Sequence, residues 1–343
     1  MSRLIYGICT LMVILLSGGC IHTYPVPEGP GKEPGSDPSE IRLRLTVRFP
    51  GESPDLPSFP GTGYPGVASA PCRIMVAMTD SRGNTDVRSF NVKAEDIEDN
   101  TFTLTLPQTF DALRYTLDVW ADHLHPADYT PDWYDTSDLH LIRPLWMPSG
   151  SATSRAAGSE SAYCAAASGH AGIDLTPYEG EWGYVSDVEV DLTTPLARYR
   201  LVADDYQKFL DMTATDRLYG ERYYVKVLYT SEIAGGYDLF DDHAVDPLSG
   251  VSFDTELPII TVPGVEMAIA SDRLIVDPDP GEVHLSVSVY NSAQVLICRT
   301  EDIVFKPQRG EMTTVRGNFL TDMITGGLTV DNKWSDEIII DIN

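Results

Sequence analysis

The sequence has few cysteines, and this scarcity limits how the chain can be cross-linked. After Cys20 only Cys72, Cys164 and Cys298 remain. Three thiols cannot all pair, so the disulfide framework on which small secreted domains depend is excluded. A single Cys72–Cys164 disulfide is chemically allowed in an oxidising compartment. No Cys-x-x-Cys motif or cysteine–histidine cluster at zinc spacing occurs, so we expect no structural metal.

Basic residues are also scarce. The chain has 24 lysines and arginines against 51 aspartates and glutamates, which gives a formal net charge of −27. Such a polyanion repels nucleic acids and anionic membrane surfaces, so a nucleic-acid partner is not expected. A well-hydrated exported surface is the better explanation of the acidity.

Motifs of catalysis are lacking. The sequence has no Gly-x-Ser-x-Gly elbow, no phosphate-binding loop, no His-Glu-x-x-His and no dinucleotide-binding glycine pattern. The acidic residues could supply a carboxylate pair of the glycosidase type, but the sequence singles none out. We therefore expect no enzymatic activity, no catalytic residues and no cofactor.

Two polar clusters could bind a metal, and for each a simpler interpretation is favoured. His123 and His125 would share one face of a strand, but an isolated pair beside Pro126 is typical of a solvated turn. The stretch 238–246 holds four aspartates that could bind calcium, yet it lacks the spacing and central glycine of a helical calcium loop. Solvated charge is the favoured interpretation of that stretch, and no metal site is expected.

The chain has no apolar run long enough to span a membrane. One short apolar run, residues 11–16, follows Arg3 and leads through small residues into Cys20. This is the layout of a bacterial lipoprotein signal, although Leu16 lies four rather than three residues before the cysteine. We expect a cleaved signal over residues 1–19 and a lipid on Cys20. The alternative is an ordinary signal peptide with an incidental Cys20.

Residues 20–40 begin with the expected lipidated cysteine and contain five prolines among glycines and charges. Such a composition cannot bury a core, so it predicts an extended spacer between the membrane and the folded part. The expected location is the outer membrane, to which the lipid would anchor the protein. The sequence does not decide between the periplasmic face and the surface-exposed face.

The folded part begins with a clear strand pattern. From Ile41 to Phe49 every second residue is apolar, as in a strand with one buried and one solvated face. The predicted core face is Ile41, Leu43, Leu45, Val47 and Phe49. The alternation recurs over 101–106, 114–120, 187–192, 222–229, 283–289 and 337–342, with shorter candidates at 73–79, 198–202, 266–270 and 302–306. Half-solvated strands favour antiparallel sheets, so the sequence predicts an all-β fold of two tandem antiparallel β-sandwich domains.

A boundary near Pro195 would divide the folded part into domains over 41–195 and 196–343. Few helices are expected: an alanine-rich one over 156–167 and about two turns over 204–212. The intervals 50–71 and 143–183 break the strand rhythm and are expected to be long loops. The apolar C-terminal strand over 336–343 is expected to pair within its own domain rather than with a neighbouring subunit.

Tryptophans concentrate in the predicted first domain. Exposed indoles can stack on sugar rings, and Trp133, Trp146 and Trp182 are candidates for such a glycan site. Core packing and loop anchoring explain most such residues, because aromatic side chains bury large areas in sandwich cores.

Three parts of the sequence resemble motifs of a known family. Residues 117–122 (LDVWAD) followed by 134–139 (YDTSDL) are similar to its "WADY … YDTSDL" element. Residues 191–199 (DLTTPLARY) are similar to its "L-x-R-P-L-A-K" element, with Thr194 where arginine is usual. Residues 313–320 (TTVRGNFL) resemble its "T-x-I-R-G-N-L-L" segment. With the lipoprotein signal and the spacer, the chain resembles anchor and minor-subunit lipoproteins of Bacteroidales-type (type V) fimbriae, in the fimbrillin-like superfamily.

The resemblance implies two transthyretin-like sandwiches and a structural, assembly or adhesion role in extracellular fibres, without enzymatic activity. The expected partners are other fimbrial subunits. The expected mechanism is strand addition, in which a neighbour's extended segment pairs with an open sheet edge. The alternative is a glycan-binding surface lipoprotein, whose partners would be host or microbial surface glycans or proteins.

The lipid anchor gives a first prediction. Cys20→Ala should release the protein from the membrane fraction, because the lipid on this cysteine is the only apolar anchor that the sequence offers. Fractionation of cells producing either form, followed by a high-salt wash, measures the release. A variant that stays in the washed membranes would contradict the prediction.

Overall fold

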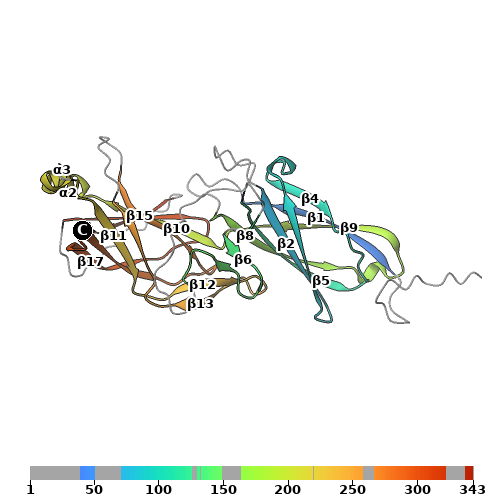
Figure 1. Ribbon diagram of the computed structural model, residues 1–343. Helices are drawn as coiled ribbons and strands as arrows, with labels where there is room; N and C mark the ends of the chain where they lie inside the picture. Colours follow the sequence, from blue (N-terminus) through green and yellow to red (C-terminus); the bar gives the residue numbers. More distant parts are fainter. Residues whose placement is uncertain are drawn as a thin grey trace, which may run out of the picture.

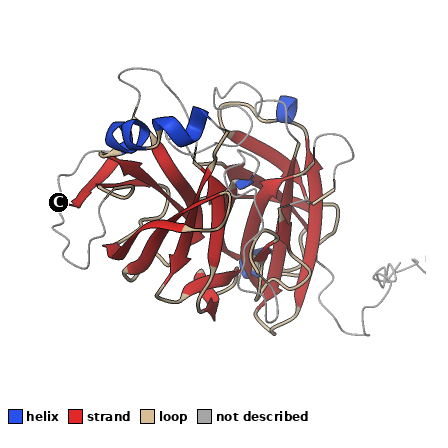
Figure 2. Cartoon of the chain, turned by 60° about the vertical axis from the view of Figure 1, so that its left-hand side comes forward, coloured by secondary structure: helices blue, strands red, loops and turns tan. Residues whose placement is uncertain are grey.

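The computed structural model describes residues 39–50, 71–125, 130–131, 133–148, 164–218, 220–257, 266–321 and 337–342. The expected signal, Cys20 and nearly all of the spacer therefore lie outside the described residues. Strands dominate the described chain, and the helices are few and short (Figure 2). The all-β class predicted from the alternation is confirmed. No helix in the described ranges combines the length and the apolar character that crossing a membrane requires.

Residues 39–195, called here the N-terminal half, build two sheets with the strand orders β4-β1-β9 and β3-β2-β5-β8. Their strands are β1 (Glu40–Arg48), β2 (Cys72–Asp80), β3 (Thr85–Val92), β4 (Thr101–Thr105), β5 (Arg114–His123), β8 (Ala166–Asp174) and β9 (Trp182–Asp191). One buried apolar cluster lies between the sheets. It contains the whole predicted face from Ile41 to Phe49, so that prediction is confirmed.

The smaller elements of this half connect the strands. They are the 3-10 helices η1 (Ala94–Asp96) and η3 (Thr176–Tyr178) and the paired two-residue strands β6 (Tyr134–Asp135) and β7 (Arg143–Pro144). The β6–β7 pair belongs to the segment 133–148, which lies next to the second half of the chain (Figure 1).

Residues 196–342, the C-terminal half, build two four-stranded sheets, with the orders β15-β10-β18-β19 and β14-β11-β16-β17. Their strands are β10 (Leu196–Ala203), β11 (Tyr223–Tyr229), β14 (Ser252–Glu256), β15 (Ala268–Ile275), β16 (Val283–Asn291), β17 (Leu296–Phe305), β18 (Met312–Gly317) and β19 (Glu337–Ile342). A separate hairpin, β12 (Ile233–Asp238) and β13 (His243–Leu248), points toward the N-terminal half (Figure 1). The helices are α2 (Tyr206–Met212) and α3 (Ala214–Leu218).

Strand direction differs in part from the antiparallel prediction. Most described pairs are antiparallel, but β1–β9, β10–β18 and β18–β19 are parallel. The partners β1 and β9 lie far apart in sequence, as parallel pairing requires, because the chain must cross over before it returns. The C-terminal strand β19 pairs with β18 of the same chain, so the expectation of intramolecular pairing is confirmed.

The helix predicted over 156–167 is wrong where the structure describes it. Ala166 and Ala167 begin β8, which also interrupts the loop expected over 143–183. Small residues serve close sheet packing here: a Cβ on Gly169 would lie 2.4 Å from the Asp191 carbonyl oxygen. Tertiary packing therefore overrides the helix propensity of alanine.

The second predicted helix is present as α2, and the residue that precedes it is Asp205. The Asp205 side chain makes no capping hydrogen bond. One of its carboxylate oxygens instead accepts hydrogen bonds from the amides of Leu320 and Thr321, at 2.9 and 2.6 Å. Asp205 thus joins the start of α2 to the segment after β18.

Candidate functional site at the junction of the two halves

The segment 133–148 of the N-terminal half is packed into the C-terminal half. Tyr134, Ile142 and Trp146 belong to the same buried cluster as the core of strands β10 to β18. The main chains are also joined, because Ile142 and Tyr237 exchange two amide-to-carbonyl hydrogen bonds of 2.8 and 2.9 Å. One apolar core therefore continues across the sequence position near Pro195. We propose that the halves are domains that share a core at this junction.

Four aromatic side chains form the apolar part of the junction. Trp120 of β5 meets Tyr134 edge to face with ring centroids 5.2 Å apart, and Tyr134 meets Trp146 in the same way at 5.3 Å. Tyr237 of β12 also packs against Trp120, with the ring centroids 5.7 Å apart. Aromatic pairs in such geometries add about 0.5–1.5 kcal/mol each beyond the area that they bury.

Most polar atoms of this cluster are satisfied inside it, whereas the buried Trp146 indole N–H has no hydrogen-bond partner among the described residues. The Trp120 indole donates to Asp122 at 3.0 Å, and Asp122 also accepts two hydrogen bonds from Arg73. The Tyr134 hydroxyl donates to the Cys164 carbonyl at 2.6 Å. The motif residues Trp120, Asp122 and Tyr134 therefore meet at the junction, where they support packing and not chemistry.

Close contact at the junction requires a glycine in β12. A Cβ on Gly236 would lie 2.6 Å from the Leu141 side chain and 3.1 Å from the Ile142 carbonyl oxygen. Any larger residue would push β12 away from the segment 133–148. The small side chain thus allows the two main chains to pair.

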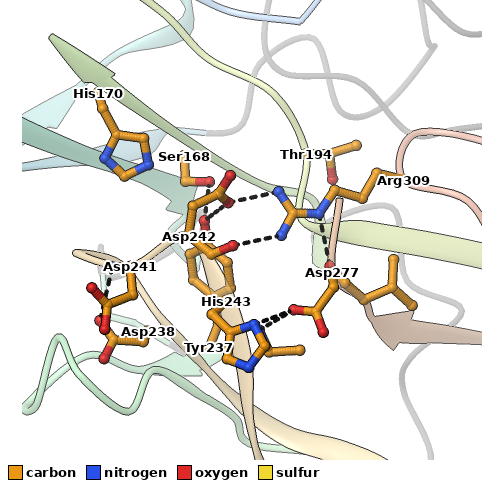
Figure 3. Close-up of polar contacts among 12 residues, drawn as sticks. Ser168, His170, Thr194, Tyr237, Asp238, Asp241, Asp242, His243, Asp277 and Arg309 are labelled. Carbon is orange, nitrogen blue, oxygen red and sulfur yellow. Dashed lines mark hydrogen bonds and ion pairs between the residues drawn. The ribbon is translucent and has the colours of Figure 1, made fainter. Parts of the chain in front are cut away.

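A polar network surrounds the Tyr237 hydroxyl (Figure 3). This hydroxyl lies 2.7 Å from the Ser168 hydroxyl, which comes from β8 of the N-terminal half. It donates to Asp242 at 2.5 Å, and Asp242 also accepts from Arg309 at 2.6 Å. Burial acts to raise the pKa of Asp242, but the hydrogen bonds from Tyr237 and Arg309 outweigh it and hold the pKa below its ordinary value.

Two further charged pairs link segment 133–148 to the hairpin. His140 lies 2.9 Å from Asp238, and Arg143 donates to Asp246 at 2.9 Å. The hydrogen bond with Asp238 raises the pKa of His140, which favours its protonated form. The His140 side chain is well exposed, so this pair adds little to stability.

The favoured interpretation of 238–246 as solvated charge is wrong for most of its aspartates. Asp238 is buried, and Asp242 and Asp246 are half-buried and paired with arginines. Only Asp241 is exposed. The stretch provides the acceptors of the junction, a role that local sequence does not reveal because the donors lie far away in the chain. Within the described ranges no group of three or more potential ligands is arranged to hold a metal ion.

His123 is also placed differently from the prediction. It ends β5 and is fully buried, whereas a solvated turn was expected. Burial, together with the charge of Arg273, lowers its pKa to about 4. His125 lies just beyond the strand, where its amide donates to the Thr130 carbonyl at 2.8 Å. The two histidines therefore have different environments.

The three candidate tryptophans are not equally accessible. Trp146 is 3% exposed in the junction core and offers no open ring face. Trp133 is partly buried against the same core. Trp182 is 52% exposed at the start of β9, where it pairs with Glu40 of β1. The structure brings Trp133 and Trp146 to the junction and leaves Trp182 on another element.

Cys72, Cys164 and Cys298 are buried and make no disulfide in the described structure, so the Cys72–Cys164 bridge that the sequence allowed is not formed. Cys72 belongs to the core of the N-terminal half and Cys164 to the junction cluster. Burial raises the pKa of Cys72 to about 12, and nearby Asp122 adds to the shift. A thiol with that pKa is a poor nucleophile.

Comparison with known proteins places this fold in a family. A family model matches residues 40–343. The chain belongs to DUF6562, a family of unknown function. No curated protein matches the DUF6562 chain.

Solved structures with a similar fold come from related bacteria. A candidate cell adhesion protein from Bacteroides eggerthii has 12% identity and a TM-score of 0.46, over 89% of this chain and 98% of that one. A fimbrial assembly protein from Parabacteroides distasonis has 14% identity and a TM-score of 0.35, over 81% and 90%. The fimbrial anchor protein Mfa2 from Porphyromonas gingivalis has 12% identity and a TM-score of 0.34, over 76% and 82%.

The hydroxyl pair between the halves can be measured by a double-mutant cycle. Ser168→Ala and Tyr237→Phe, alone and together, should give a coupling energy of about 0.5–1.5 kcal/mol, because each removes one partner of the same hydrogen bond. Urea unfolding of the four proteins supplies the free energies. The pair Ser168→Ala and Tyr224→Phe is the control, since Tyr224 lies on β11, outside the network. Additive effects in the first cycle would contradict the contact.

Buried His123 predicts a loss of stability in acid. Its folded-state pKa of about 4 lies below the ordinary 6.5, so the unfolded chain binds the proton more readily. The stability held by neutral His123 is therefore complete above pH about 6.5 and falls by about 3 kcal/mol as the pH drops to 4.

The measurement is the free energy of unfolding in urea across that pH range. In His123→Gln the free energy of unfolding should depend less steeply on pH. The slope should fall by the equivalent of up to one bound proton, whatever the stability of the variant at neutral pH. His284→Gln, which changes a histidine that is more exposed, is the control. Identical pH slopes for the wild type and His123→Gln would contradict the assignment.

Proposed function

We propose that this DUF6562 protein is a lipid-anchored fimbrial subunit or fimbrillin-like surface protein of the outer membrane. Cys20 would carry the lipid, and the folded part would act in assembly or adhesion by strand addition. No enzymatic activity is part of the proposal. The sequence motifs and the tandem arrangement of open-edged sheets support it.

The observation that carries the proposal is the free edge at β17. This strand ends the sheet β14-β11-β16-β17, so its outer side has no strand partner among the described residues. Its first residues, Leu296 and Ile297, and the preceding Val295 are 44%, 38% and 55% exposed. Adjacent exposed aliphatic side chains on an unpaired edge are a template for another chain.

The rest of β17 is protected against unspecific pairing. Arg299 and Glu301 form an exposed ion pair on it, and Asp302 adopts a positive φ of 56°. A register irregularity lies opposite this part, between Leu285 and Val287 of β16, and a second one, between Val289 and Tyr290, lies opposite Leu296 and Cys298. Charges and irregularities of this kind blunt an edge. The open part is therefore short and confined to the beginning of the strand, as a specific contact requires.

The test is recovery of fimbrial subunits with the protein. Wild-type protein purified from the native bacterium should bring a ladder of such subunits, and Leu296→Lys should reduce their yield about tenfold, because a charge on an edge opposes strand pairing. Val87→Lys is the matched control, since Val87 is 42% exposed on another edge strand, β3.

Wild-type protein that brings no fimbrial subunit would contradict the proposed function. Glycan-array binding by the wild type that Trp182→Ala abolishes would favour the glycan-binding alternative instead, because Trp182 is the exposed member of the three candidates.

A further inference from the structure

A groove of about 350 Å³ lies between the β12–β13 hairpin and the end of β15. Its walls are formed by residues 232–234, 243–245 and Pro247 of the hairpin region, by 274–277, by the turn 280–283 and by Pro307. None of its lining residues is a lysine or an arginine, whereas three are carboxylates, Glu232, Asp277 and Glu282. The groove is therefore apolar with an acidic rim.

The two walls are fixed to each other by the polar network of the junction. The Asp277 carboxylate accepts a hydrogen bond from the Ala244 amide at 2.7 Å and lies 2.8 Å from His243 (Figure 3). Arg309 donates to the Val276 carbonyl on one wall, at 2.7 Å, and to Asp242 on the hairpin. A groove held in shape before binding loses less entropy when it is occupied.

The chemistry of the lining indicates what would fit. Ala234, Ala244 and Val245 are half-buried and give apolar contacts. Glu232 and Glu282 are exposed at the rim, and Asp277 is already engaged with the hairpin. Aliphatic side chains would fill the groove, while positive charges on either side would lie near the two glutamates.

The edge of β13 indicates an extended chain as the occupant. In the described part of the protein, β13 pairs only with β12, so its other side has no strand partner. The Ala244 amide on this edge already donates to Asp277, so an extended segment could bond only to the part of the edge beyond Ala244. Main-chain bonding would give affinity, and the acidic rim would select basic segments.

We propose that this groove binds an extended segment of a partner protein in which aliphatic residues are flanked by lysine or arginine. The proposal rests on the proposed function in one respect, because the segment would belong to a neighbouring subunit. Charge complementarity favours this occupant over a second copy of the chain, since two copies of net charge −27 repel each other.

Binding of defined peptides to the full chain tests the groove itself. The probes are a labelled, blocked peptide of alternating valine and lysine, about seven residues long, and its counterpart with glutamate at each lysine. Fluorescence polarisation should show binding of the lysine peptide, and at least about tenfold weaker binding of the glutamate peptide. Glu232→Lys with Glu282→Lys should weaken binding of the lysine peptide about tenfold. Glu179→Lys with Glu181→Lys makes the same charge change on exposed residues outside the groove and should leave binding unchanged.

Equal binding of the lysine peptide to both double variants, or no binding to the wild type, would overturn the proposal. Thermal unfolding of each variant shows that the comparison is between folded proteins. Self-association of the wild type that Glu232→Lys with Glu282→Lys abolishes in sedimentation would make a second copy the occupant and also overturn it.

Fimbrial subunits recovered in unchanged amounts with this double variant would show that assembly uses another surface, and the proposed function would still hold. A wild type that binds the peptide but co-purifies with no fimbrial subunit would contradict the proposed function and still support the proposal about the groove.

Discussion

The buried side chain of Tyr237 is the constraint on which the junction depends. Its ring packs against Trp120, its main chain pairs with Ile142, and its hydroxyl bonds to Ser168 and Asp242. A buried hydroxyl or carboxylate that loses its partners costs about 1–3 kcal/mol or more. Rotation of one half against the other would break several of these contacts at once, so the network opposes independent motion.

This arrangement connects the proposed groove of the C-terminal half with the body of the protein. The groove beside β13 shares Arg309 and Asp277 with the junction network, so its shape depends on the same contacts. The free edge of β17 lies on a different sheet. In the proposed function the protein would transmit force from one neighbouring subunit to the next, and a shared core between its halves would suit that task.

The sequence predicted those features that local pattern determines. Alternation from Ile41 to Phe49 identified the first strand and its core face, because one residue of error would have placed the arginines inside. The sequence pattern gave the wrong prediction at β8, where a helix was expected. The small residues alanine and glycine serve close packing against β9 there and not helix formation. The pattern also failed for the aspartates of 238–246 and for His123, because their partners, such as Arg309 in the turn before β18, come from distant parts of the chain. Contacts between residues far apart in the chain leave no periodic signal in either segment.

The central claim is that the halves form one cooperative unit, and differential scanning calorimetry of the full chain tests it most directly. A shared core predicts a single transition in which the calorimetric and van't Hoff enthalpies agree for the whole chain. Tyr237→Phe should move that transition to lower temperature as a whole. Two separate transitions in the wild type, with only one of them shifted by Tyr237→Phe, would contradict the account.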